Sequence, residues 1–120
     1  MDRDNLKKTI KGWLLKINKE DILPDNIVAL NFGLYEPYGI ELIGAEVYDP
    51  DDDDWACEED FEPKQRSCDL NIPKTAAWED VLNSVVIVLN ELTDELKDIQ
   101  LLNVKHITTG FSDGDLVVVK

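Results

Sequence analysis

The spacing of apolar residues switches between two periods along this chain, and this switching limits the folds that the chain can form. Over 4–18, apolar side chains recur every three or four residues, which predicts an amphipathic helix. The same period returns over 76–99 and predicts a second helix. Between and after these segments, apolar residues alternate with small or polar ones, as in strands with one buried face. The face of the first helix is formed by Leu6, Ile10, Trp13, Leu14 and Ile17.

Residues at the expected helix ends agree with this interpretation. Asp2 or Asp4 is expected to cap the first helix, because a carboxylate accepts hydrogen bonds from the free N–H groups there. Thr75 is expected to cap the second helix, after Pro73. Trp78 falls on the apolar face of that helix, so we expect it to pack in the core.

The strand-like segments complete an α+β pattern. Pro37 and Gly39 lie in a turn between the first two of these segments, and Asp113-Gly114 forms a second turn signal near the end of the chain. We therefore expect residues 1–120 to form a single α+β domain. Its architecture is expected to be a two-layer sandwich, an antiparallel sheet of four to five strands with two helices packed on one face. The expected strands are 27–35, 40–48, 67–71, 104–111 and 116–119.

Negative charge dominates the chain and is concentrated in one segment. The sequence has 26 acidic and 12 basic residues, a net charge of −14. Residues 49–62, called the acidic loop below, contain nine of the acids and no basic residue, and Lys64 and Arg66 follow them. This charge argues against binding to nucleic acid or to an anionic membrane. It favours a basic protein or a metal cation as the partner.

The acidic loop also contains Trp55 and Phe61, which plain solvated acidic tracts lack. Aromatic anchors surrounded by charge are typical of protein-binding hot spots. The alternative is that these two rings fold the loop back onto the core. The residues predicted to bind a partner are Asp51, Asp52, Asp53, Asp54, Trp55, Glu58, Glu59, Asp60 and Phe61.

Calcium is the second hypothesis for the same loop. Asp49, Asp51, Asp53 and Asp60 follow part of the ligand spacing of an EF-hand. Asp54 stands where that motif needs glycine for its sharp turn, and the flanking segments are not helical in pattern. The loop is therefore not an EF-hand, and a looser calcium site formed by these carboxylates remains the alternative.

The remaining candidate residues do not form a catalytic pattern. His106 is the only histidine and lies within an expected strand, without a nucleophile pattern beside it. Cys57 and Cys68 have no standard zinc-ligand spacing. The N-terminal residues do not resemble a signal peptide, so we expect a cytoplasmic location with both cysteines as free thiols. The sequence thus predicts a non-enzymatic binding protein without a cofactor or a metal.

Part of the chain resembles a known class of proteins. The features are the strand end at 32–36, the Ile43-Gly44-Ala45 strand, and the run from Asp52 to Cys57. With these features, residues 23–63 resemble small bacterial immunity proteins of polymorphic-toxin systems. The resemblance implies a compact acidic α+β domain in the cytoplasm that binds and blocks a cognate toxin, often a basic nuclease. It assigns no individual binding residue. An apolar outer face of the sheet would add a homodimer to these expectations.

Overall fold

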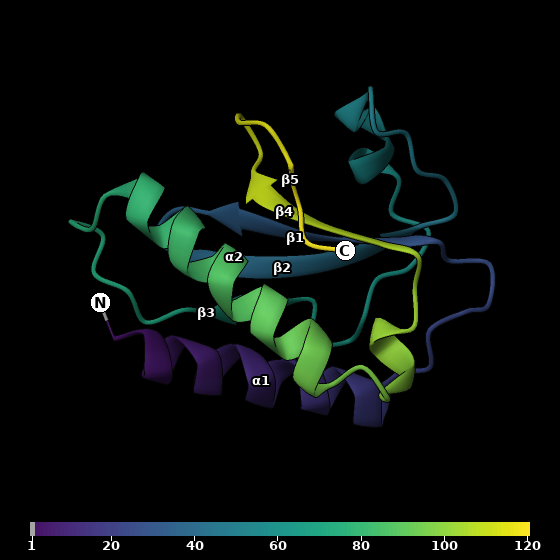
Figure 1. Ribbon diagram of the computed structural model, residues 1–120, viewed down its shortest axis with the longest axis horizontal. Coiled ribbons are helices and arrows are strands. Elements are labelled where there is room, and N and C mark those ends of the chain that lie inside the picture. Colours follow the sequence, from purple (N-terminus) through teal and green to yellow (C-terminus); the bar gives the residue numbers. More distant parts are fainter. Residues whose placement is uncertain (1) are drawn as a thin grey trace.

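The computed structural model describes residues 2–120, which form two long helices, two short 3-10 helices and a five-stranded sheet (Figure 1). The helices and strands lie close to the segments expected from the pattern of apolar residues. In chain order the elements are α1 (Arg3–Glu20), β1 (Ala29–Tyr35), β2 (Gly39–Ala45), η1 (Asp53–Cys57), β3 (Ser67–Asp69), α2 (Trp78–Glu95), η2 (Gln100–Leu102), β4 (His106–Phe111) and β5 (Val117–Val118).

The two long helices begin in different ways. Asp2 caps α1, because its Oδ1 accepts hydrogen bonds from the backbone N–H groups of Asp4 at 3.0 Å and Asn5 at 3.4 Å. The predicted cap of α2 is wrong: the N-cap residue is Ala77, whose side chain makes no capping hydrogen bond, and not Thr75. A turn closed by the Ala76 N–H donating to the Pro73 carbonyl at 3.0 Å keeps Thr75 outside the helix.

The sheet has the strand order β3-β2-β1-β4-β5. The α+β class and the packing of both helices on one face are confirmed. The sheet is mixed, however, and not antiparallel throughout, because β1 and β4 pair in parallel while the other three neighbouring pairs are antiparallel. The chain passes through α2 between β3 and β4, and such a crossover returns it beside β1 in the same direction. Apolar spacing does not encode strand direction, so it did not predict this pairing.

The main core lies between the helices and one face of the sheet. Leu30, Phe32 and Leu34 of β1 point to this side and are buried. Trp13 of α1 packs edge-to-face on Phe32, with ring centroids 6.1 Å apart, and its indole N–H donates to the Gln65 carbonyl at 2.7 Å. None of the helices within residues 2–120 is both long enough and apolar enough to cross a membrane.

Trp78 differs from the prediction that placed it in the core. It is the first residue of α2, and 51% of it is exposed. Its ring contacts Phe111, the last residue of β4, edge-to-face at 6.1 Å. The helical period assigned Trp78 to the correct side of the helix but did not reveal that the sheet ends beneath it.

Candidate functional site

The face of the sheet that points away from the helices is built from small and polar residues. Asn31 lies between Ile43 of β2 and Thr108 of β4, and the Thr108 hydroxyl donates to Asn31 Oδ1 at 2.9 Å. In the next row, Gly33 lies between Glu41 and Gly110. The middle strand thus presents little side-chain bulk on this outer face. It is not the broad apolar surface that would favour a homodimer.

The acidic loop folds over one end of the outer face (Figure 1). Trp55 of η1 is 5% exposed and packs with Ala29 and Ala45, whose methyl groups leave room for the indole ring. Tyr48 contacts Trp55 edge-to-face at 5.1 Å and stacks on His106 at 3.9 Å. Tyr48 and His106 therefore help to pack the base of the loop.

Phe61 fixes the other end of the loop. Its side chain is 8% exposed and belongs to the main core. Its backbone exchanges two hydrogen bonds with Gly44, with N to O distances of 2.9 and 3.0 Å. A Cβ atom at Gly44 would lie 2.9 Å from Ile27 Cγ2 and 3.1 Å from Phe61 Cβ, so this close approach requires glycine.

These positions correct one part of the sequence prediction. Trp55 and Phe61 were expected to be surface anchors for a partner, and this role is wrong because both rings are buried within the protein. They instead fold the loop onto the core, which was the alternative interpretation. The physical reason differs for the two rings: Trp55 covers the methyl groups of Ala29 and Ala45 on the outer face, whereas Phe61 joins the main core on the helix side.

The other seven predicted residues, Asp51–Asp54 and Glu58–Asp60, all lie on the exposed side of the loop. Some of these carboxylates support the local fold. Asp52 Oδ1 accepts from the Asp54 N–H at 3.0 Å, and Asp60 Oδ2 accepts from the Glu46 N–H at 2.9 Å. Asp51, Asp54 and Glu58 make no hydrogen bond or ion pair through their side chains within residues 2–120, so their charges face solvent.

Arg66, just after the loop, pairs with three carboxylates. Its guanidinium contacts Glu59, lies 3.2 Å from Glu62 and lies 3.5 Å from Glu41. The hydrogen bond from Arg66 holds the pKa of Glu59 below its usual value, and the same bond raises the pKa of Arg66. One guanidinium balances only one of the three carboxylates, so this cluster stays negative.

A groove of about 360 Å³ separates the loop from the rest of the outer face. Asn31, Gly33 and Glu41 line it from the sheet, while Asp53 and Glu59 line it from the loop. All of its charged lining residues are acidic. The groove and the carboxylates above it form one negatively charged surface, which is the candidate functional site.

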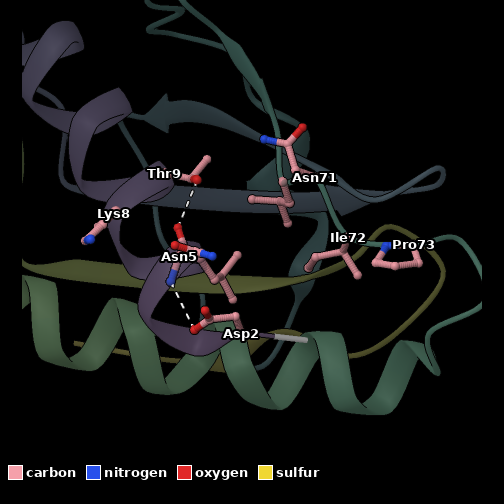
Figure 2. A pocket seen from close by; sticks show the side chains of 9 residues that line it. Asp2, Asn5, Lys8, Thr9, Asn71, Ile72 and Pro73 are labelled. Carbon is pink, nitrogen blue, oxygen red and sulfur yellow. Dashed lines mark hydrogen bonds between the residues drawn. The ribbon is translucent and has the colours of Figure 1, made fainter.

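A larger cavity, of about 500 Å³, lies elsewhere, between α1 and residues 70–73 (Figure 2). Asp2, Asn5 and Thr9 line it, and the side chains of Asp2 and Thr9 bond to the backbone of the helix. The Asp2 carboxylate accepts from the Asn5 N–H, and the Thr9 hydroxyl donates to the Asn5 carbonyl at 2.9 Å. The side chains of Asp2 and Thr9 at this cavity are therefore already bonded to the helix backbone.

Metal ligation has little geometric support in the described part of the chain. No group of three or more His, Cys, Asp or Glu side chains within residues 2–120 is arranged to hold a metal ion. The calcium hypothesis thus has no preformed ligand cluster at the loop. Cys57 is exposed and Cys68 is partly buried, and both are free thiols. Burial raises the pKa of the Cys68 thiol, helped by the nearby Asp69 charge.

Comparison of the chain with protein-family models, curated proteins and solved structures found no match. The resemblance to immunity proteins therefore stays an expectation. The functional-site prediction missed Glu41 and Arg66, which come from outside the acidic loop. The basic residues directly after that loop were the available signal for Arg66, whereas Glu41 enters the site only through strand pairing.

Proposed function

We propose that this protein is a non-enzymatic binding domain whose acidic loop binds a basic protein partner. The observation that carries this proposal is the opposite placement of the two kinds of side chain in the loop. The aromatic rings of Trp55 and Phe61 are buried beneath it, while the predicted acidic residues are exposed above it. The loop is therefore a preorganised acidic surface, and preorganisation lowers the entropy cost of binding.

Electrostatics support a basic partner. The loop holds nine acids and no base in a chain whose net charge is −14. Its field is expected to attract a cationic surface over roughly a Debye length, about 10 Å at 0.1 M salt. Asp51, Asp54 and Glu58 pair with no cation within residues 2–120, so their charges are available to attract a partner's lysine or arginine.

An inhibitor of a basic toxin is the form of this function that the sequence resemblance favours. In that case the protein acts in the bacterial cytoplasm and covers a cationic surface of the toxin. Such a role needs no catalytic group, which is compatible with a site made of carboxylates, small residues and a groove. The groove gives the partner a concave place for one of its side chains.

A charge-matched pair of variants tests this proposal. The loop variant combines Asp51→Asn, Asp54→Asn and Glu58→Gln, exposed residues whose side chains make no hydrogen bond or ion pair within residues 2–120. The control variant combines Asp25→Asn, Asp94→Asn and Asp98→Asn, exposed carboxylates outside the loop. Each variant removes three negative charges, which changes the net charge from −14 to −11.

The assay is affinity capture from the native lysate in EDTA, at about 50 mM and about 500 mM salt. We expect the wild type and the control variant to retain the same basic protein at low salt, and the loop variant to lose it. High salt should weaken capture in every case. Equal capture by the loop and control variants would contradict the proposed binding surface.

A further inference from the structure

A third, smaller pocket of about 250 Å³ lies at the end of the sheet, where three separate segments meet. Glu36 comes from the turn after β1, Trp78 is the first residue of α2, and Phe111 ends β4. Asp113 and Gly114, in the turn before β5, complete the lining. The acidic loop does not contribute to this pocket, so its chemistry is an independent observation.

The pocket has an aromatic wall that solvent reaches. Trp78 and Phe111 meet with their ring planes at 86°, an edge-to-face contact that fixes the angle between the rings. Phe111 in turn contacts the buried Tyr38 edge-to-face at 6.2 Å, so the wall is supported from the core. Half of Trp78 nevertheless stays exposed, although tryptophan gains most from burial. An exposed but supported tryptophan is typical of a binding hot spot.

The charged residues around this wall are acidic. Glu36 and Asp113 are the two charged lining residues, and both are carboxylates. Glu79 and Asp80 follow in the first turn of α2 and offset the positive end of its helix dipole. Burial raises the pKa of the Tyr38 hydroxyl, and the negative charges of Glu36 and Glu79 raise it further.

We propose that this pocket binds the guanidinium group of an arginine side chain. A guanidinium stacks on an aromatic ring with its flat face while its N–H groups point outward to carboxylates. The Trp78–Phe111 wall provides the ring surface, and Glu36 and Asp113 provide the acceptors on its rim. A lysine ammonium is more strongly hydrated and lacks the planar fork, so the pocket favours arginine.

The arginine belongs to the same basic partner that we assign to the acidic loop, and this part of the inference rests on the proposed function. Phe111 and Gly114 line both this pocket and the groove beneath the loop, so the two sites adjoin at the turn before β5. A partner that covers the loop therefore reaches Trp78 without leaving the negatively charged surface. Trp78 would then supply the aromatic anchor that Trp55 and Phe61, being buried, do not.

The test uses the indole N–H signals in two-dimensional NMR spectra of the full chain. The signal of Trp78 is identified by its absence in Trp78→Phe. The probes are a capped pentapeptide with two arginines, and the same peptide with citrulline or lysine in their place. We expect the arginine peptide to shift the Trp78 signal and to leave those of Trp13 and Trp55 unmoved, since both are buried. The uncharged citrulline peptide should shift none of them.

Two variants and their control sharpen the result. Trp78→Leu should weaken binding of the arginine peptide by about two- to fivefold, as expected for an exposed cation–π contact. The double variant Glu36→Gln/Asp113→Asn should also weaken it, while Asp25→Asn/Asp94→Asn, which loses the same charge elsewhere, should not. The assignment would be overturned if the arginine peptide left the Trp78 signal unmoved, or if the citrulline peptide shifted it equally. It would also be overturned if the lysine peptide shifted it more, or if the two charge variants weakened binding equally.

The two proposals fail separately. If the arginine peptide shifts the Trp78 signal but the loop variant still captures the basic partner, the arginine pocket is supported and binding by the acidic loop is refuted. If the loop variant loses the partner while the arginine peptide leaves the Trp78 signal unmoved, binding by the acidic loop is supported and the arginine pocket is refuted.

Discussion

Trp55 and Trp78 offer a matched test of how the acidic loop is held, because the same substitution has different expected costs at the two positions. Trp55 is 5% exposed beneath the loop, whereas Trp78 is 51% exposed at the start of α2. A tryptophan side chain buries at most about 250 Å². At about 25 cal/mol per Å², nearly full burial is worth up to about 6 kcal/mol, and half burial up to about 3 kcal/mol.

Both values are upper limits, because the unfolded chain already buries part of its apolar surface. Measured costs of truncating a core tryptophan to alanine are about 3–5 kcal/mol. We therefore expect Trp55→Ala to lower the free energy of unfolding by about 3–5 kcal/mol and Trp78→Ala by about half as much. The difference, about 2 kcal/mol, is the quantity that the structure predicts.

Urea unfolding followed by far-ultraviolet circular dichroism measures both free energies. Hydrogen exchange should also show faster exchange at the Gly44–Phe61 backbone pair in Trp55→Ala, since the loop loses one of its two attachments. Equal costs for the two substitutions, or a smaller cost at Trp55, would refute the idea that a buried indole holds the loop on the sheet.

Three further predictions test other parts of the structure. In thermal unfolding, Gly44→Ala should cost about 1–3 kcal/mol, because the added Cβ would crowd Ile27 and Phe61. At Gly12 an added Cβ would meet none of the surrounding atoms within 4 Å, so Gly12→Ala should stabilise α1 by about 0.5–1 kcal/mol. Ellman's reagent at pH 7 should modify the exposed Cys57 at least about tenfold faster than Cys68, because burial raises the pKa of the Cys68 thiol. Peptide mass spectrometry distinguishes the two modified thiols, and equal rates would contradict this expectation. Because the pKa of Glu59 is lowered, its bond to Arg66 stabilises the fold above pH 4.5, and this stability is lost as the pH falls through the lowered pKa. Glu59→Gln should therefore make the free energy of unfolding depend less on pH on the acid side. An unchanged pH dependence would argue against the bond.

The sequence pattern was sufficient for the α+β class and for the approximate position of the two long helices and the five strands, but it did not predict the short helices η1 and η2. It did not reveal that β1 and β4 run parallel, because strand direction depends on the path of the crossover through α2. Trp78 shows the same limit on a smaller scale. The helical period places it on the apolar face, but its exposure depends on where the sheet ends.

The site was predicted in part, for a related reason. Composition located the acidic loop, and its seven candidate carboxylates all lie on the exposed side. The roles of Trp55 and Phe61 depended on the two faces of a sheet whose pairing was not known. Ala29, Ala45 and Gly44 meet the two rings only after β1 and β2 pair in register, so local sequence could not distinguish an exposed anchor from a buried one.

The most direct test of the account is the salt dependence of affinity between this protein and the basic partner that it captures. Titration calorimetry across several salt concentrations gives the slope of log affinity against log salt for the wild type, the loop variant and the charge-matched control. Binding through the acidic loop predicts a steep slope for the wild type and the control, and a shallower slope with weaker binding for the loop variant. The same slope and the same affinity in all three proteins would contradict binding through the acidic loop.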